Sequence, residues 1–280
     1  MRIAKGLIPG IIAISLFTAS CGHGSHQEEA PAQDTAVAAP VTVALADVPA
    51  SPEYNDARLS IGNVTAAAQG TDSVKLSFSF DVKNYELKNQ TADAGNKMCN
   101  NSDKGQHIHF ILDNKPYVAL YEPKHEVVLP KGGEHYLLVF LSRSYHESVK
   151  SKGAADLMHF KIDDKGKLQK LEAPKTPMIF YSRPKGDYIG ASNTDNLLLD
   201  FYVWNCALSD SSYKVNAQLK ADGVDTTFTI NTWAPHFLQH VPMGKPSVTL
   251  TLVDKDGNAV QGDNTNVTRE FNLAAEEPMK

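Results

Sequence analysis

The chain has 280 residues, a net charge of −5 and 42% hydrophobic residues. Acidic and basic residues are interspersed, so the sequence lacks the basic stripe that nucleic-acid binding requires, and nucleic acid is excluded as a partner. Beyond residue 21 no apolar run approaches the roughly 20 residues that cross a bilayer. The remaining length corresponds to two ordinary domains of roughly 100–200 residues each.

The first 21 residues have the pattern of a signal peptide. Arg2 and Lys5 precede an apolar run over 6–17, which is too short to span a membrane. The segment 18–21 resembles the lipobox of bacterial lipoproteins, in which the signal is cleaved before a cysteine that is then acylated. The resemblance implies a lipid anchor at Cys21 and a place in the bacterial cell envelope, in the outer membrane at its periplasmic face or at the cell surface. The alternative is ordinary secretion with cleavage nearby.

Residues 22–56 are predicted to form a disordered tether. They are rich in Ala, Pro, Glu and Gln and show no hydrophobic periodicity. Such a segment cannot bury enough apolar surface to become ordered. Its pair Glu28-Glu29 resembles an export signal that sends some Gram-negative lipoproteins to the cell surface.

From residue 57 onward, alternation of apolar and polar residues dominates. In 76–83 every second residue is apolar, which is the pattern of an antiparallel strand with one buried face. Short turn sequences such as 131–133 separate several of the runs. These patterns predict an all-β chain built of antiparallel sandwiches. The other expected strands are 107–112, 117–121, 136–142, 157–162, 178–182, 196–204, 213–219, 226–231, 247–253 and 267–273.

The second half of the chain repeats the pattern of the first half. Residues 76–87 align with 197–208, and a duplicated immunoglobulin-like sandwich explains both this match and the length. We therefore predict two tandem immunoglobulin-like domains, over 57–165 and 166–280. The alternative is a chance likeness between similar strands. The matched pairs are Phe80 with Phe201, Val82 with Val203, Asn84 with Asn205, Gly133 with Gly244, Val139 with Leu250 and Phe160 with Phe271.

Some outer faces of the expected strands are also apolar. Leu138 and Phe140 point away from the core of the first domain, as do Tyr202 and Trp204 in the second. Such faces are either covered by the sister domain, in a rigid tandem, or exposed as a binding surface.

The strand over 107–112 carries the sharpest candidate site. His107 and His109 are two residues apart and so share one face of the strand, while the intervening residues line the core. Two imidazoles on one face can provide two ligands of a zinc or copper site. The structural alternative is that these histidines hydrogen-bond to loops or stack on Tyr117 or Tyr121. The candidates for a third ligand are His146, His135, His125 and Glu122, and the predicted metal set is His107, His109 and His146.

A second candidate lies in the segment 141–148, where the second copy has a plain turn. Arg143 offers a bidentate donor fork and Ser144 adds a hydroxyl, a combination suited to an anion. The spacing of Ser142, Arg143 and His146 resembles the Ser-Arg-x-His element of forkhead-associated phosphopeptide-binding domains, with one residue more. The alternative is a solvated loop held by an ion pair between Arg143 and a nearby carboxylate.

A third stretch, 180–188, lies between the two copies. Its aromatic residues are expected to pack in the seam between the domains, and its cations Arg183 and Lys185 are left to face ligand or water.

Apart from Cys21, the chain contains Cys99 and Cys206. In an oxidising compartment they can form a disulfide that ties the two domains together. The alternative is a free, buried Cys206.

No motif of catalysis occurs in the sequence. A nucleophile elbow, a His-Glu-x-x-His pair and a phosphate-cradling glycine loop are all missing. We therefore expect a protein that is not an enzyme.

The runs GQHIHFILDNKPYVALYEP, FLSRSYHES and FYSRPKGDYIGA resemble a family of uncharacterised bacterial lipoproteins that are labelled phosphopeptide-binding proteins. The resemblance covers roughly residues 55–273. It implies a phosphorylated or anionic peptide, or an envelope protein, as a partner. The positions it singles out are His107, His109, Tyr121, Glu122, Arg143, Ser144, His146, Arg183 and Lys185.

The sequence thus predicts a lipid-anchored envelope protein that binds a ligand through its first sandwich, at a histidine-based metal site or at an anion site. The alternative from another class is a structural or assembly lipoprotein. In that case the apolar sandwich faces dock a protein partner.

Overall fold

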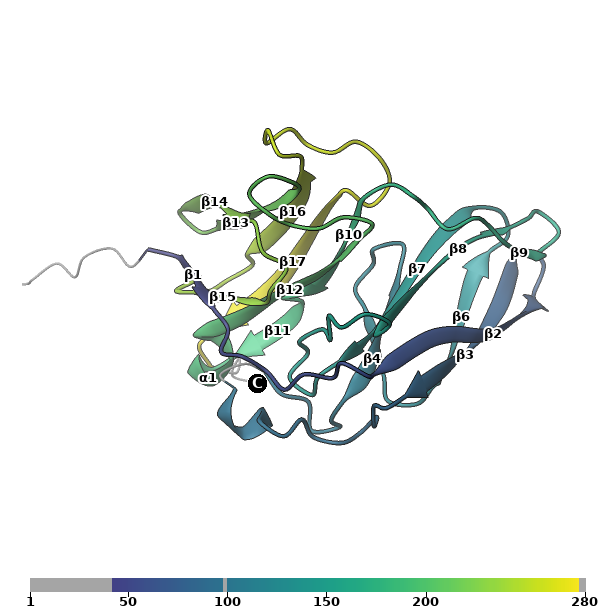
Figure 1. Cartoon of the computed structure of the whole chain (residues 1–280), viewed down its shortest axis with the longest axis horizontal. Coiled ribbons are helices and arrows are strands. Elements are labelled where there is room, and N and C mark those ends of the chain that lie inside the picture. Colours follow the sequence, from purple (N-terminus) through teal and green to yellow (C-terminus); the bar gives the residue numbers. More distant parts are fainter. Residues whose placement is uncertain (1–41, 98–99, 277–280) are drawn as a thin grey trace, which may run out of the picture. The chain divides into compact units, whose positions relative to one another are not determined.

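The computed structural model describes residues 42–97 and 100–276 (Figure 1). These residues form four β-sheets that pack as two sandwiches. The alternation in β3 (Ser73–Lys83) shows why: Val74, Leu76, Phe78 and Phe80 are buried, and the polar residues between them face outward. The chain is therefore all-β, with two tandem immunoglobulin-like sandwiches.

The first sandwich packs the sheet β2-β3-β6 against the sheet β5-β4-β7-β8-β9. Its core includes Phe80, Phe110, Leu137 and Phe160. The other strands are β2 (Arg58–Gln69), β4 (His107–Leu112), β5 (Val118–Leu120), β6 (Lys124–Pro130), β7 (Glu134–Ser142), β8 (Ala155–Ile162) and β9 (Leu168–Lys170).

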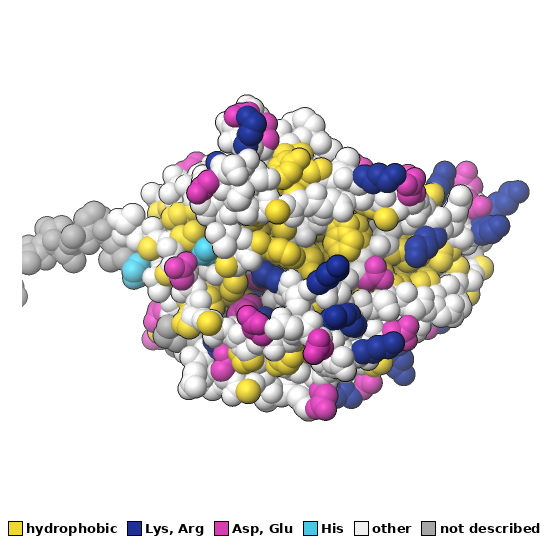
Figure 2. Space-filling model, viewed as in Figure 1, with side chains coloured by type: hydrophobic (Ala, Val, Ile, Leu, Met, Phe, Trp, Pro, Cys, Tyr) yellow, Lys and Arg dark blue, Asp and Glu magenta, His cyan; other side chains and the backbone are white. Residues whose placement is uncertain are grey.

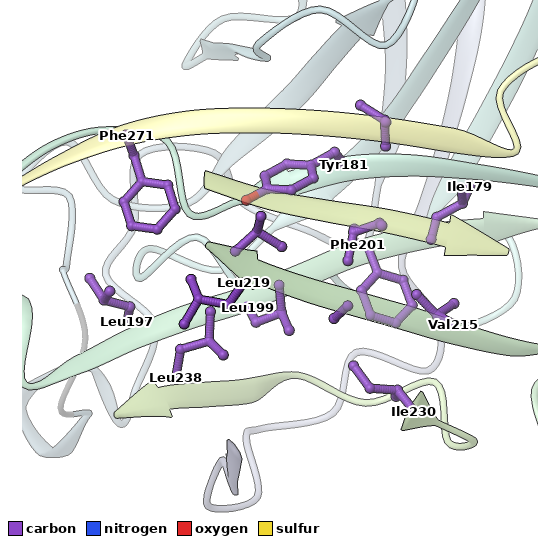
Figure 3. Close-up of a cluster of buried hydrophobic side chains, with 14 of the residues drawn as sticks. Ile179, Tyr181, Leu197, Leu199, Phe201, Val215, Leu219, Ile230, Leu238 and Phe271 are labelled. Atoms are coloured by element: carbon purple, nitrogen blue, oxygen red, sulfur yellow. The ribbon is translucent and has the colours of Figure 1, made fainter. Parts of the chain in front are cut away.

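The second sandwich packs the sheet β1-β15-β12-β10 against β11-β17-β16-β13-β14. Figure 3 shows its core, in which Leu199, Leu219 and Leu238 from three strands point toward one another. The strands are β1 (Ala44–Asp47), β10 (Met178–Arg183), β11 (Gly186–Ile189), β12 (Asn196–Trp204), β13 (Lys214–Ala221), β14 (Val224–Ile230), β15 (His236–Gln239), β16 (Ser247–Val253) and β17 (Asn266–Ala274).

The matched strands have the same order in the two sandwiches, as the sequence repeat predicts, whereas β1 and the parallel strand β11 have no counterpart in the first sandwich. β3 lies between β2 and β6, and β12 lies likewise between β10 and β15; β4 lies between β5 and β7, and β13 between β14 and β16. The matched residues Asn84 and Asn205 both have a φ of 55°. Asparagine is one of the few residues that adopts this left-handed conformation readily. The repeat therefore extends to the turns that follow the matched strands.

The structure differs from the prediction at two boundaries. The tether prediction for 22–56 is wrong for its last part, because β1 pairs with β15 along Ala44–Asp47 and Val43 is buried in the second core. The proposed boundary at 165/166 is also too early, because β9 continues the first sandwich to Lys170 by pairing with β8. Neither short edge strand has enough alternation to be read from the sequence.

The apolar outer faces of the two sandwiches cover one another. A separate buried cluster joins Leu138 and Phe140 of β7 to Phe180 of β10 and Tyr202 of β12. The sequence left open whether these faces are covered by the sister domain or exposed as a binding surface. In the structure the sister domain covers them. Of the aromatic residues of 180–188, which were expected in this seam, only Phe180 lies there, because Tyr181 and Tyr188 pack in the core of the second sandwich.

Helix is limited to the short segments η1 (Ala94–Asn96) and α1 (Ala191–Thr194) in the described part of the chain. Neither of these helices has the length and apolar character needed to cross a membrane. On the face shown in Figure 2, acidic and basic side chains are mixed over the surface rather than gathered into one patch of a single sign.

Candidate metal centre

Strand β4 presents His107 and His109 on the face that the sequence predicts. Ile108 and Phe110 enter the first core, whereas Ile111, on the histidine face, enters the seam between the sandwiches. Both histidines have no solvent exposure. The pair therefore lies at the seam and not on an open surface.

A close backbone contact fixes the first histidine. His107 Nδ1 donates to the carbonyl oxygen of Gly105 over 2.9 Å. Gly105 has a φ of 80°, and a Cβ atom there would lie 2.2 Å from the backbone oxygen of Lys88, so only glycine fits. Because a carbonyl only accepts, Nδ1 carries the proton, and Nε2 of the neutral ring presents a lone pair.

The second histidine bridges the two sandwiches. His109 Nδ1 lies 3.2 Å from the hydroxyl oxygen of Ser182 in β10. Its Nε2 lies 3.0 Å from Nε2 of His107. Ring nitrogens that face a site while their partner nitrogen is held by a hydrogen bond are typical of metal-binding histidines.

The third histidine comes from the loop after β7. His146 has a φ of 68°, which few residues other than glycine adopt. A tight turn holds it there, since the backbone N–H of His146 donates to Arg143 and that of Arg143 donates to Glu147. His146 is 8% exposed, and its Nδ1 lies 3.1 Å from Nε2 of His107.

The three nitrogens lie close together, with His107 Nε2 between the other two. They lie within 4.8 Å of one another, and the two short separations of 3.0 and 3.1 Å approach the roughly 3.3 Å expected between nitrogens on one tetrahedral zinc ion. His107 Nε2 has a single lone pair but two close neighbours, so direct hydrogen bonds cannot serve both well. One cation between the rings would accept lone pairs from all three.

The electrostatic surroundings keep these rings neutral. Burial lowers the pKa of His107 to about 4 and lowers the pKa values of His109 and His146 well below their usual range. The charges of Arg183 and Lys185 act in the same direction on all three. Neutral imidazole is the form that binds a metal, so near neutral pH no proton has to leave.

Aromatic rings and two cations surround the cluster. Tyr117 stacks on His109 with ring centroids 3.6 Å apart, and Tyr121 lies 5.1 Å from the His107 ring. Lys185 Nζ lies 4.1 Å from the Tyr117 ring centroid, and burial lowers its pKa to about 8. Arg183 donates to the Tyr188 hydroxyl over 2.8 Å, and within the described residues neither cation forms an ion pair with a carboxylate.

The other candidates for a third ligand lie elsewhere. His135 Nδ1 is 2.8 Å from a carboxylate oxygen of Asp113, and His125 contacts Phe110 in an edge-to-face arrangement on the core side of β4. Glu122 is exposed and pairs with Lys88. Of the four candidates, only His146 joins the pair on β4.

The Ser-Arg loop is held together from within. Arg143 pairs with Glu147 over 3.0 Å and also donates to the carbonyl oxygens of Pro52 and Ser148. Ser144 exchanges hydrogen bonds with Thr91. A surface cleft of about 390 Å³ borders Arg143, but the guanidinium is already engaged. This loop builds the turn that carries His146 instead of offering free donors.

Tyr121 and the cysteines were also singled out in the sequence. Tyr121 bonds through its hydroxyl to Ser102 over 2.6 Å, beside the His107 ring. Cys206 is a free, half-buried cysteine, which corresponds to the alternative and not to the proposed disulfide. Its expected partner Cys99 and the expected lipidation site Cys21 lie outside the described residues.

The sequence did not single out Ser182 or Gly105, which orient the two histidines on β4. Ser182 directly precedes Arg183 in the second Ser-Arg pair, and Gly105 stands two residues before His107. The contact of Ser182 with His109 depends on the packing of the two sandwiches, and the contact of Gly105 with His107 depends on the left-handed backbone at Gly105.

No family model matches this sequence, and no curated protein matches it. The solved structures that are similar to it include three of fibronectin type III modules. Fibronectin(III)-like modules of Clostridium thermocellum CbhA have a TM-score of 0.27 at 11% identity, over 79% of this chain and 98% of that one. Chicken CNTN1 FN1–FN3 domains have 0.22 at 12% identity, over 79% and 68%. The central fibronectin-III array of RIM-binding protein has 0.23 at 10% identity, over 83% and 73%.

Proposed function

We propose that this chain is a lipid-anchored binding protein of the bacterial cell envelope that holds a zinc or copper ion in its first sandwich. The ligands are His107 Nε2, His109 Nε2 and His146 Nδ1. The observation that carries the proposal is the convergence of these three buried nitrogens within 4.8 Å. The envelope location and the outer-membrane anchor rest on the resemblance of 18–21 to a lipobox.

The donor set suits these metals. Imidazole nitrogen is a common ligand of both zinc and copper, and three histidines with one open position form a recurring zinc site. A metal centre also needs groups that orient its ligands. Hydrogen bonds to Gly105 and Ser182 orient the rings of His107 and His109 in this way.

The alternative function, a structural or assembly lipoprotein, is less well supported. It requires apolar outer faces that are free to dock a protein partner, but Phe140 and Tyr202 of these faces are buried against each other in the seam. Among the described residues the large exposed hydrophobic side chains are only Val118, Val128 and Met243, and single exposed residues of this kind are ordinary.

The anion reading is also less well supported. Arg143 donates to Glu147 and Pro52, the backbone N–H of Ser144 donates to Thr91, and the Ser144 hydroxyl accepts from the backbone N–H of Thr91. A phosphorylated peptide would have to break these bonds before it could use these donors. We propose a binding protein rather than an enzyme.

The test is titration of the metal-free protein with Zn²⁺ and with Cu²⁺ by calorimetry, together with equilibrium dialysis. We expect one metal ion per chain. The variants His109→Ala and His146→Asn should lose tight binding, and asparagine suits the left-handed backbone at position 146.

The matched control is His240→Asn, which removes an exposed histidine that also has a positive φ, far along the chain in the loop after β15. It should bind metal as the parent protein does. Urea unfolding of each variant shows whether the fold is kept. If neither metal binds, or if both site variants bind as tightly as the parent, the proposal is wrong.

A further inference from the structure

The hydroxyl of Tyr117 lies beside the histidine cluster, within hydrogen-bond distance of His146. Tyr117 immediately precedes β5, which pairs with β4 so that Ala119 stands opposite His109. Its oxygen is 3.2 Å from His146 Nδ1, the nitrogen that also faces His107. Ligand atoms on one tetrahedral ion lie roughly this far apart.

The Tyr117 ring is held on more than one side. It is 3% exposed and stacks on His109 with an interplanar angle of 10°. Lys185 Nζ contacts the ring and donates to the Tyr117 backbone oxygen over 3.0 Å. Arg183 also lies against it, with 5.5 Å between the guanidinium carbon and the ring centroid. The oxygen therefore keeps one position.

The charges of the site call for an anionic ligand. The three histidines are neutral, and the convergent group of potential ligands contains no carboxylate among the described residues. Arg183 and Lys185 already place positive charge nearby. A divalent ion added to this set would raise the positive charge further, at a cost that is large because the site is buried.

We propose that Tyr117 is the fourth metal ligand and binds through its oxygen as a phenolate. This inference rests on the proposed metal site. On binding, the O–H bond of Tyr117 breaks, a metal–oxygen bond forms and the proton passes to the solvent. The phenolate offsets one positive charge of the metal and faces Arg183. The cations Arg183 and Lys185, which would repel a bare dication, therefore stabilise the anionic ligand.

The proposed ligand set also favours Cu²⁺ over Cu⁺. A phenolate oxygen with three imidazole nitrogens suits Cu²⁺ or Zn²⁺, whereas Cu⁺ prefers soft sulfur ligands. We therefore infer that this site holds the divalent ions. For Cu²⁺ the phenolate should give a charge-transfer absorption band in the visible region, which imidazole ligands alone do not give.

The experiment compares the parent protein with Tyr117→Phe. Calorimetric titrations at pH 7 in buffers of different ionisation enthalpy give the number of protons released per metal ion. The parent should release about one proton, since neutral histidines release none. Tyr117→Phe should release none, lack the visible band with Cu²⁺ and bind at least roughly tenfold more weakly through the histidines alone.

Tyr121→Phe is the matched control, because Tyr121 is a phenol beside His107 whose oxygen bonds to Ser102 instead of facing the nitrogens. It should keep both the proton release and the band. Metal binding by the parent without proton release, or an unchanged band in Tyr117→Phe, would overturn the role of Tyr117 and leave the histidine site standing. A parent protein that binds no metal overturns both.

Discussion

Phe140 of the first sandwich stacks on Tyr202 of the second, with ring centroids 5.1 Å apart and ring planes 20° from parallel. Both side chains are buried, and both belong to strand faces that point away from their own cores. The seam they form continues to His109, whose ring lies 4.9 Å from that of Phe140. The packing of the two domains therefore sets the position of the candidate metal ligands.

The Phe140–Tyr202 contact should be measurable as a coupling between the sandwiches. Phe140→Ala is expected to lower the free energy of unfolding by about 3–5 kcal/mol, because it leaves a large cavity. In a double-mutant cycle with Tyr202→Ala, urea unfolding should give a coupling energy of about 0.5–1.5 kcal/mol. Strictly additive effects would mean that the two rings do not stabilise one another.

Much of this fold follows from alternation. The bounds of β4, β12 and β16 coincide with the expected strands 107–112, 196–204 and 247–253. In β16 the buried face is set by neighbours two residues apart, which is local information, whereas β4 and β12 are buried on both faces. The order of the matched strands in the second sandwich then follows from the repeat.

The remaining parts depend on partners far along the chain. β1 has four residues and is ordered by β15, which lies about 190 residues later. In the site, alternation placed His107 and His109 together, and His146 was the predicted third ligand among four candidates, although no local pattern could show that it converges with the pair. His146 is selected by the left-handed turn in its loop, and Tyr117 by the pairing of β5 with β4.

If the segment around β1 is ordered, substitution of a buried residue in it should lower the free energy of unfolding, which would not happen in a disordered tether. Val43 is 7% exposed and packs in the second core. Val43→Ala should lower the free energy of unfolding by roughly 2 kcal/mol, from two lost methyl groups and the space they leave. Thr42→Ala, at the exposed neighbour, should change it by less than about 0.5 kcal/mol. Equal effects in urea unfolding would contradict the pairing of this segment.

The buried histidines should make the metal-free protein sensitive to acid. The pKa of His107 is about 4 in the fold and 6.5 in the unfolded chain, so the unfolded state takes up a proton first. Stability that is present above pH 6.5 is then lost as the pH falls toward 4, by about 3 kcal/mol for His107 alone. His109 and His146 act in the same direction, and the facing cations Arg183 and Lys185 oppose protonation.

Urea unfolding with a chelator present, at pH 7 and at pH 4.5, measures this loss. His107→Gln should show a smaller decrease between the two pH values than the parent protein, because one group no longer titrates. The two proteins losing the same free energy would show that His107 is not buried as a neutral ring.

Burial of Cys206 should make its thiol slow to react. Burial raises the pKa of this thiol to about 11, and the thiolate is the form that is alkylated. At pH 8 the rate of alkylation by iodoacetamide, followed by mass spectrometry of the peptide that contains Cys206, should be on the order of a hundredfold lower in the folded protein than in urea. Up to about pH 10 the rate should rise nearly tenfold per pH unit. If Cys206 resists alkylation in urea until reductant is added, it forms a disulfide, and the assignment of a free thiol is wrong.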